Sequence, residues 1–153
     1  MTKIEEEKLA IRLMKEDDLE AIVGIDTKVG GAERKEYYEG KINLMLDSVG
    51  SIATSLVAVY DGQVIGFVMG KVFKGEFGIP EKKAQLDTIG IDPEFGGQGV
   101  GSRLLEEFEN HVKMAGVENI QTLVDWENKS LMKFFNNSGF APSQTLNLEK
   151  DIQ

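Results

Sequence analysis

A glycine-rich turn between a strand and a helix is the most informative feature of the chain. Residues 89–105 read IGIDPEFGGQGVGSRLL, and four of the six residues from Gly96 to Gly101 are glycines. A strand is expected over residues 86–92, ended by Pro93, and apolar residues after the turn recur at the three- and four-residue spacing of an amphipathic helix. Because glycine lets the backbone approach a ligand and a helix start attracts anions, the turn predicts a pyrophosphate site.

The spacing of this turn argues against other phosphate-binding loops. A Walker A loop needs a lysine directly before Ser102, where the chain has Gly101. A dinucleotide fingerprint starting at Gly97 would have Ser102 in place of its third glycine. Asp125 follows at the distance of a ribose-binding acid, but too little chain remains for a long doubly wound sheet. A kinase loop lies between two strands, not before a helix. A tight turn without a ligand stays an alternative.

The composition restricts the chemistry. The chain has 153 residues, with 26 acidic and 17 basic side chains, a formal charge of −9, one histidine and no cysteine. The length suits a single domain over residues 1–153. No cysteine means no thiolate nucleophile, and His111 alone cannot form a multi-histidine site, so no metal centre is expected. The charge disfavours nucleic acid and anionic membranes as partners, and a polar start without a long apolar run predicts a cytoplasmic protein.

Hydrophobic periodicity predicts a mixed sheet with helices on its faces, an α/β or α+β fold. Asp61-Gly62 between two apolar runs predicts a hairpin of residues 56–60 and 63–72 with a type I′ turn. The second helix is expected to bury four side chains, namely Tyr38, Ile42, Met45 and Leu46. The other expected elements are strands over 8–14, 119–126 and 140–148, a loop over 73–82, and helices over 16–30, 32–47, 101–115 and 128–137.

The turn resembles motif A of the GCN5-related N-acetyltransferases, the GNAT family, written Q/R-x-x-G-x-G/A after a V-x-P strand end. The matching residues are 96–101, GGQGVG, preceded by 91–93, IDP. The hairpin before the motif, the helix after Asn128 and the closing residues 137–140 also fall where the family has them. The resemblance covers about residues 9–148. It implies the acyl-CoA N-acyltransferase fold, with a mixed, mostly antiparallel central sheet and helices on both faces.

The resemblance also implies that acetyl-CoA binds in a V-shaped gap between two parallel strands. Backbone groups of Ile89 and Ile91 would pair with the pantetheine arm as an added strand. Amides of the glycine turn would hold the pyrophosphate, and Asn128 would reach the pantetheine from the last helix. The cofactor-binding residues implied in this way are Ile89, Gly90, Ile91, Gly96, Gly97, Gln98, Gly99, Val100, Gly101, Ser102, Asn128 and Phe135.

Two positions depart from the family pattern. Gly96 stands where the family has Arg or Gln, which removes a charged hydrogen bond worth about 1.5–3 kcal/mol and would weaken CoA binding roughly ten- to a hundred-fold. Arg103 in the first helical turn is a candidate to compensate. The family's Phe-Tyr pair, whose tyrosine protonates the leaving thiolate, is here Phe134-Phe135. General acid catalysis is worth about 10²–10⁴-fold, but a thiolate leaves fairly well without it, so we expect an active protein less dependent on an acid.

The base and the acceptor complete the predicted reaction. Many family members place a Glu on the strand before motif A, and Asp87 is the candidate base near that place; alternatively, Asp87 faces solvent or pairs with a lysine. With no cysteine to carry an acyl group, acetyl transfer from acetyl-CoA to a primary amine should be direct. The acidic surface favours a cationic acceptor. A non-catalytic acyl-CoA-binding or regulatory domain is the alternative function. The sheet edges could also form a homodimer.

Overall fold

The computed structural model describes residues 2–47 and 54–153. The chain divides into two compact units, Met1–Thr122 and Leu123–Gln153. A single domain over residues 1–153 stays a prediction. In the described residues, no helix is long and apolar enough to cross a membrane.

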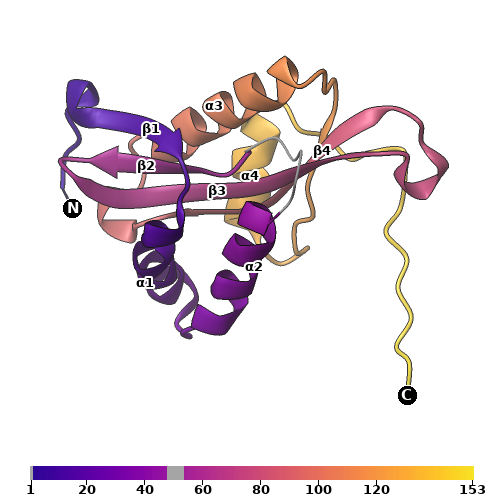
Figure 1. The fold of residues 1–153 in the computed structure, drawn as a ribbon, viewed down its shortest axis with the longest axis horizontal. Coiled ribbons are helices and arrows are strands. Elements are labelled where there is room, and N and C mark those ends of the chain that lie inside the picture. Colours follow the sequence, from indigo (N-terminus) through magenta and orange to yellow (C-terminus); the bar gives the residue numbers. More distant parts are fainter. Residues whose placement is uncertain (1, 48–53) are drawn as a thin grey trace. The chain divides into compact units, whose positions relative to one another are not determined.

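The first unit contains a five-stranded sheet in the order β1-β2-β3-β4-β5. The strands are β1 (Leu9–Leu13), β2 (Leu56–Tyr60), β3 (Gln63–Lys74), β4 (Lys82–Ile91) and β5 (Ile120–Gln121). The first four pair antiparallel, and β5 runs parallel to β4. The predicted mixed, mostly antiparallel sheet is confirmed (Figure 1).

The hairpin of β2 and β3 turns at Asp61 and Gly62, as predicted. Their φ angles are 50° and 82°. A type I′ turn needs a positive φ at both central residues, and its twist matches the twist of the flanking strands. The turn therefore sets the pairing of Tyr60 with Gln63 at this end of the hairpin.

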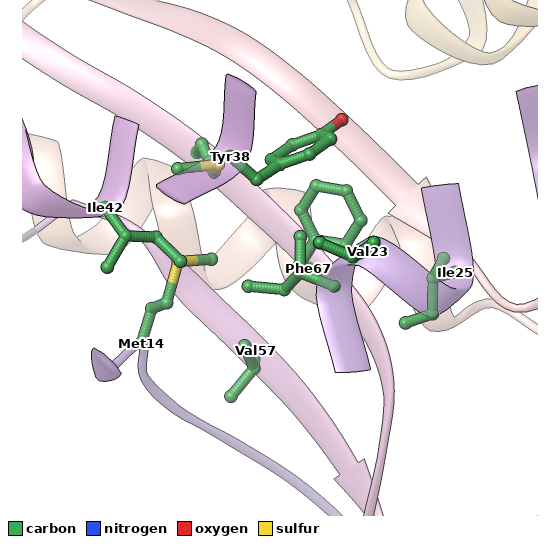
Figure 2. Close-up of a cluster of buried hydrophobic side chains, with 9 residues drawn as sticks. Met14, Val23, Ile25, Tyr38, Ile42, Val57 and Phe67 are labelled. Carbon is green, nitrogen blue, oxygen red and sulfur yellow. The ribbon is translucent and has the colours of Figure 1, made fainter. Parts of the chain in front are cut away.

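Helices cover both faces of the sheet, as predicted (Figure 1). On one face, α1 (Leu19–Gly30) and α2 (Lys35–Asp47) pack on β2 and β3. Figure 2 shows Tyr38 and Ile42 of α2 in this core together with Phe67 of β3. Each of these side chains is at most 1% exposed, and burying an apolar side chain of this size stabilises the fold by about 1.5–3 kcal/mol. The predicted contacts of Met45 and Leu46 lie outside the described side chains.

The opposite face carries α3 (Val100–Met114), which approaches the sheet over two glycines. A Cβ atom at Gly70 would lie 2.4 Å from the ring of Phe108, and one at Gly66 would lie 3.1 Å from Leu104. Both distances are too short for ordinary packing. Because the two glycines have no side chains, the buried face of α3 can lie directly on β3.

The second unit contains α4 (Lys129–Asn137), which ends at Ser138 and Gly139. Residues 140–153, all of them described, form neither helix nor strand, so the predicted strand over 140–148 is wrong. Pro142 has no amide to donate, and the hydroxyl of Ser143 donates to the Thr145 carbonyl at 2.9 Å. Alternating apolar residues predict a strand only where a neighbouring strand pairs with them.

Three predicted boundaries also change. β4 begins at Lys82, so the predicted loop over 73–82 shrinks to residues 75–81 with a short 3₁₀ turn, Glu76–Gly78. The second helix begins at Lys35 and not at residue 32. The predicted strand over 119–126 is reduced to β5. Directly after β5, the hydroxyl of Thr122 donates to a β4 carbonyl where a longer ladder would place a backbone amide.

Candidate functional site

A β-bulge in β4 places Asp87 out of register with its neighbour strand. Leu86 pairs with Gly70 and Thr88 pairs with Met69, so Asp87 has no counterpart in β3. Asp87 lies on the α2 side of the sheet, and the hydroxyl of Thr88 donates to its Oδ2 at 3.3 Å. The candidate base thus lies at a local break in the ladder.

β4 and β5 part at the same level. They pair only at Ala84 with Ile120 and at Gln85 with Gln121. The hydroxyl of Thr122 then donates to the Leu86 carbonyl at 2.9 Å. Among the strands that the structure describes, residues 88–91 of β4 pair with β3 alone. One edge of β4 therefore stays open beyond the bulge.

The open edge carries the backbone groups of Ile89 and Ile91. The Asp92 amide donates to the Ile65 carbonyl at 2.8 Å, which makes Asp92 and Ile65 a hydrogen-bonded pair. In an antiparallel ladder such pairs alternate with pairs whose N–H and C=O groups point away from each other. The register therefore directs the polar groups of Ile91 and Ile89 away from β3. These are the two residues expected to pair with a pantetheine arm.

Gly90 lies between them and has a packing role. A Cβ atom there would come within 2.7 Å of the Phe67 ring on the paired strand. Its carbonyl and amide belong to the ladder with β3 by the same alternation. Gly90 thus leaves room for the Phe67 ring beside the open edge, and its place in cofactor binding stays a prediction.

Asp92 anchors the turn that follows β4. It is 3% exposed, its Oδ1 accepts the Glu94 amide at 3.0 Å, and its Oδ2 accepts from Lys28 of α1 at 2.8 Å. Burial disfavours the charged carboxylate, but these two hydrogen bonds outweigh burial and lower the pKa of Asp92. The carboxylate therefore ties α1 to the start of the glycine-rich turn.

The glycine-rich turn leaves its amides open at the start of α3. Gly97 and Gly99 have φ angles of 70° and 86°, which other residues adopt only with strain, whereas Gly96 is extended at −68°. Gly99 is the N-cap residue and supplies no side-chain cap, and the first turn of α3, described in full, holds no acidic side chain. The amides from Val100 to Ser102 therefore lack helical acceptors and suit an anion.

The side chains of the turn contribute less than its backbone. Val100 is 1% exposed and packs in the core, so only its backbone amide is left for the predicted contact with a ligand. The Gln98 side chain holds the N-terminal segment: its Oε1 accepts the Ile4 amide at 2.7 Å, and its Nε2 donates to the Thr2 carbonyl at 2.6 Å. Nothing in the sequence pattern links Gln98 to residues more than ninety positions away. Because the Gln98 side chain is occupied in this way, its backbone amide is the group that remains for the predicted phosphate contact.

Lys41 of α2 forms an ion pair with Asp87. The two side chains are 27% and 34% exposed, and the Lys41 ammonium lies 5.1 Å from the centre of the Tyr37 ring. Burial opposes the charge of Lys41, but the hydrogen bond and charge of Asp87 outweigh it and raise the pKa of Lys41. The alternative that Asp87 pairs with a lysine is thus confirmed. Sequence reasoning missed Lys41 because 46 positions separate the partners.

A second charged cluster fixes α2 against α1 beside this pair. Arg34 donates to both carboxylate oxygens of Asp26, at 2.9 and 2.6 Å, and the Tyr38 hydroxyl donates to Asp26 at 2.9 Å. Arg34 lowers the pKa of Asp26, and burial raises the pKa of Tyr38. The guanidinium also lies 5.0 Å from the centre of the Tyr37 ring. Tyr37 therefore contacts Arg34 and Lys41 at once.

Two predicted site residues belong to the second unit. Asn128 caps α4, because its Oδ1 accepts the Leu131 amide at 3.2 Å; its Nδ2 is the donor that suits a ligand. Phe135 is 4% exposed, and its ring centre lies 5.3 Å from that of Phe134 and 5.0 Å from that of Phe140. The contribution of Asn128 and Phe135 to a site on the first unit stays a prediction.

The comparison with protein families agrees with this geometry. A model of the acetyltransferase (GNAT) family matches residues 11–140. The chain belongs to the GNAT family of acetyltransferases. A curated relative, the mycothiol acetyltransferase of Propionibacterium freudenreichii subsp. shermanii, is 33% identical over 84 residues. The match covers 55% of this chain and 26% of that protein, so the chain spans about a quarter of the relative's length.

Solved structures share the fold. The aminoglycoside N-acetyltransferase AAC(6')-Iy in complex with CoA is similar with a TM-score of 0.78 and 19% identity, over 94% of both chains. A transcriptional regulator from Bacillus halodurans C-125 is similar with a TM-score of 0.78 and 20% identity, over 94% of this chain and 99% of that chain. At these identities the likeness establishes the fold alone.

Proposed function

We propose that this protein is an acetyl-CoA-dependent N-acetyltransferase that transfers the acetyl group directly to a primary amine. The observation that carries the proposal is two stretches of open backbone groups that follow each other along the chain, Ile89 and Ile91 at the edge of β4 and the uncapped start of α3. An extended amide-containing arm suits the strand edge, and a pyrophosphate suits the helix start. CoA joins these two chemistries in one molecule.

The cofactor would be held mainly by backbone groups. The pantetheine amides would pair with Ile89 and Ile91, and the pyrophosphate would accept hydrogen bonds from the amides between Gly97 and Ser102. Backbone donors and the helix dipole act locally, so a protein with a net charge of −9 can still bind an anion. The related fold of AAC(6')-Iy has been solved with CoA, which supports this choice of ligand.

The bulge would place the acetyl thioester near Asp87. Asp87 would accept a proton from the acceptor ammonium, directly or through water, and the amine nitrogen would then bond to the thioester carbonyl carbon. The C–S bond breaks, the acetyl group stays on nitrogen, the nitrogen gives its second proton to water, and CoA leaves as a thiolate. Since Phe135 has no proton to give, water would protonate the thiolate.

The acceptor is proposed to be cationic. Lys41 already places an ammonium on Asp87, so this carboxylate suits a second ammonium that takes the place of Lys41. The acidic surface would favour the approach of such a molecule. Candidates are a polyamine, an aminoglycoside-like amine, a lysine side chain or a protein N-terminus. A cytoplasmic location and a homodimer complete the proposal.

A second function rests on specific departures from the family pattern. Gly96 lacks the usual cationic side chain, Phe135 lacks the usual hydroxyl, and Asp87 is paired. A domain that binds acyl-CoA without turnover would tolerate all three. A protein of this fold named as a transcriptional regulator makes that alternative worth testing.

A thiol-release assay separates the two functions. Acetyl-CoA is offered with a panel of polyamines, aminoglycosides, lysine peptides and peptides with free N-termini, and CoA binding is measured separately by calorimetry. We expect amine-dependent release of thiol with at least one class. Tight CoA binding without turnover on any amine would favour the non-catalytic function.

A further inference from the structure

The glycine-rich turn offers the rest of the protein a single side chain by which to hold it. Of residues 96–99, three are glycines and the fourth is Gln98. A Cβ atom at Gly97 or Gly99 would have no described neighbour within 4 Å beyond its adjacent residues, so little packs around the backbone there. Glycine also loses more conformational freedom on folding than any other residue. Gln98 is therefore the side chain that can fix these four residues in place.

The N-terminal segment, defined as residues 2–5, binds both polar atoms of the Gln98 side chain. Oε1 accepts the Ile4 amide at 2.7 Å, and Nε2 donates to the Thr2 carbonyl at 2.6 Å. The Thr2 amide donates to the Glu94 carbonyl at 3.1 Å, and the Thr2 hydroxyl donates to Oε1 of Glu94 at 3.2 Å. The segment thus joins the residues just before the glycines to the side chain among them, all within the first unit.

Tyr60 at the end of β2 holds the other half of the segment. Its hydroxyl accepts the Glu5 amide at 3.3 Å and donates to the Lys3 carbonyl at 3.4 Å. Its ring centre lies 5.7 Å from that of Phe95, the residue directly before the glycines. Residues 2–5 belong to no helix or strand, and five of their backbone groups bind the turn or Tyr60. The segment is therefore docked on the turn and not built into the sheet.

A segment docked in this way can open without unfolding the protein. Thr2, Lys3 and Glu5 are exposed, so hydrogen bonds and not core packing hold the segment. Exposed hydrogen bonds with few apolar contacts open at a small part of the free energy of global unfolding. Opening would release Gln98 and leave the glycine backbone free to change conformation. A loop already held in its bound conformation binds a ligand more tightly, because less ordering is needed on binding.

We propose that the N-terminal segment is a positioning element of the CoA site. Docked on Gln98, it would hold the glycine-rich turn in the conformation whose amides receive the pyrophosphate. This inference rests on the proposed CoA binding. Because coupling between two binding events is reciprocal, CoA would also tighten the docking of the segment. The affinity for CoA would then fall whenever residues 2–5 are lifted from the turn, which makes the segment a control point for the cofactor.

The first test replaces the Gln98 side chain and keeps its backbone amide. Gln98→Met removes both side-chain hydrogen bonds and should raise the CoA dissociation constant about tenfold by calorimetry. The KM for acetyl-CoA should rise with it, while kcat and the acceptor KM stay unchanged, because the segment acts on cofactor binding alone. The matched control is Gln63→Met, the same change at an exposed residue of the hairpin, which should leave CoA binding unchanged. Circular dichroism melts establish that each variant is folded.

The second test approaches the same contact from the segment. Ile4→Pro removes the amide that binds Gln98 and leaves the turn itself unaltered, so it should weaken CoA binding to a similar extent. Normal CoA affinity in Ile4→Pro would assign any effect of Gln98→Met to the turn alone and overturn the proposal. Unchanged affinity in both variants would overturn it as well.

Hydrogen exchange measures the coupling in the other direction. Saturating CoA should slow exchange of the Ile4 amide severalfold in wild type and leave it unchanged in Gln98→Met. Faster exchange with CoA, together with tighter binding in the variants, would mean that the segment obstructs the site. These measurements need binding and no turnover. A wild type that binds CoA equally well without the Gln98 contacts contradicts this inference alone, whereas a wild type that binds no CoA contradicts the proposed function too.

Discussion

The ammonium of Lys41 in α2 donates a hydrogen bond to the carboxylate of Asp87 at the bulge of β4. This pair joins α2 to the strand expected to receive the cofactor. It also means that the candidate base carries a cation before any substrate arrives. An incoming ammonium must therefore exchange with Lys41 at Asp87, which makes the pair a direct test of how the acceptor binds.

Asp87→Asn should lower kcat/KM for the acceptor by about 10²–10⁴-fold, because the amide cannot accept the ammonium proton. The CoA dissociation constant should stay unchanged, since backbone groups are expected to hold CoA. Steady-state kinetics and calorimetry check both numbers. Unchanged turnover in Asp87→Asn would assign the base to water or to another side chain.

Lys41→Met should lower the acceptor KM, because the ammonium that competes for Asp87 is removed. The pair is partly exposed, so we expect an effect of about 1 kcal/mol, which is about fivefold. The CoA dissociation constant again serves as the control. A higher KM would mean that Lys41 holds Asp87 in position for the acceptor.

Gly99→Ala should weaken CoA binding about tenfold. At φ 86° a Cβ atom is strained by about 1–2 kcal/mol, and relaxing that strain would turn the first amides of α3 away from the ligand. Gly116→Ala is the matched control, with φ 84° and equally open space at the other end of α3. Both variants should lose a similar amount of stability, but only Gly99→Ala should lose affinity for CoA. Equal CoA affinities of the two variants would show that the glycine-rich turn is not part of the binding site.

Gly96→Arg should tighten CoA binding by roughly ten- to a hundred-fold, since a charged hydrogen bond is worth about 1.5–3 kcal/mol. The backbone at Gly96 is extended, and a Cβ atom would lie 3.3 Å from the Pro93 carbonyl, which a small shift relieves. Gly96→Ala adds the Cβ atom without the charge and should leave affinity unchanged. If the arginine variant binds no better, another group already supplies this contact.

Stability should fall in acid because cations lower the pKa values of Asp18, Asp26 and Asp92. Such groups stabilise the fold fully above their unfolded pKa, about 3.9, and lose that contribution as the pH falls through the lower folded value. The free energy of unfolding should therefore be nearly constant from about pH 7 to 5 and decrease below about pH 4.

Asp92→Asn tests this predicted loss of stability in acid at a single residue. It should destabilise the protein by about 1–3 kcal/mol at neutral pH, and the difference from wild type should shrink in acid, where Asp92 itself is protonated. Urea unfolding over a range of pH measures both. A difference of the same size at every pH would show that packing, not charge, explains the loss.

Local patterns predicted most of the fold. Asp61 and Gly62 supply the backbone angles of their turn, so two adjacent residues are enough to predict it. The helix after the glycine-rich turn is predicted by apolar residues that recur at three- and four-residue spacing within the helix itself. The strand expected over 140–148 failed because its alternation needs a partner that no local pattern contains. The open edge at Ile89 and Ile91 was expected from the family resemblance, and the structure shows that it is open because the ladder between β4 and β5 ends at Gln85 and Gln121.

Tertiary contacts explain what the sequence could not predict about the site. Lys41 reaches Asp87 from a helix 46 positions earlier, and Gln98 binds the N-terminal segment from 94 and 96 positions away. Spacing rules describe neighbours within one helix, strand or turn, so they carry no information about such pairs. Asp87 is thus paired with a lysine, as one of its expected alternatives had it, and the Gln98 side chain is occupied, which leaves its backbone amide for the predicted phosphate contact.

The proposed reaction is direct transfer of an acetyl group from acetyl-CoA to an amine. The most direct measurement uses acetyl-CoA with a deuterated acetyl methyl group, and mass spectrometry of both the amine and the intact protein during turnover. We expect one labelled N-acetyl amine for each CoA thiol released and no labelled protein intermediate. Thiol release without a labelled amine, or CoA binding without any release, would contradict it.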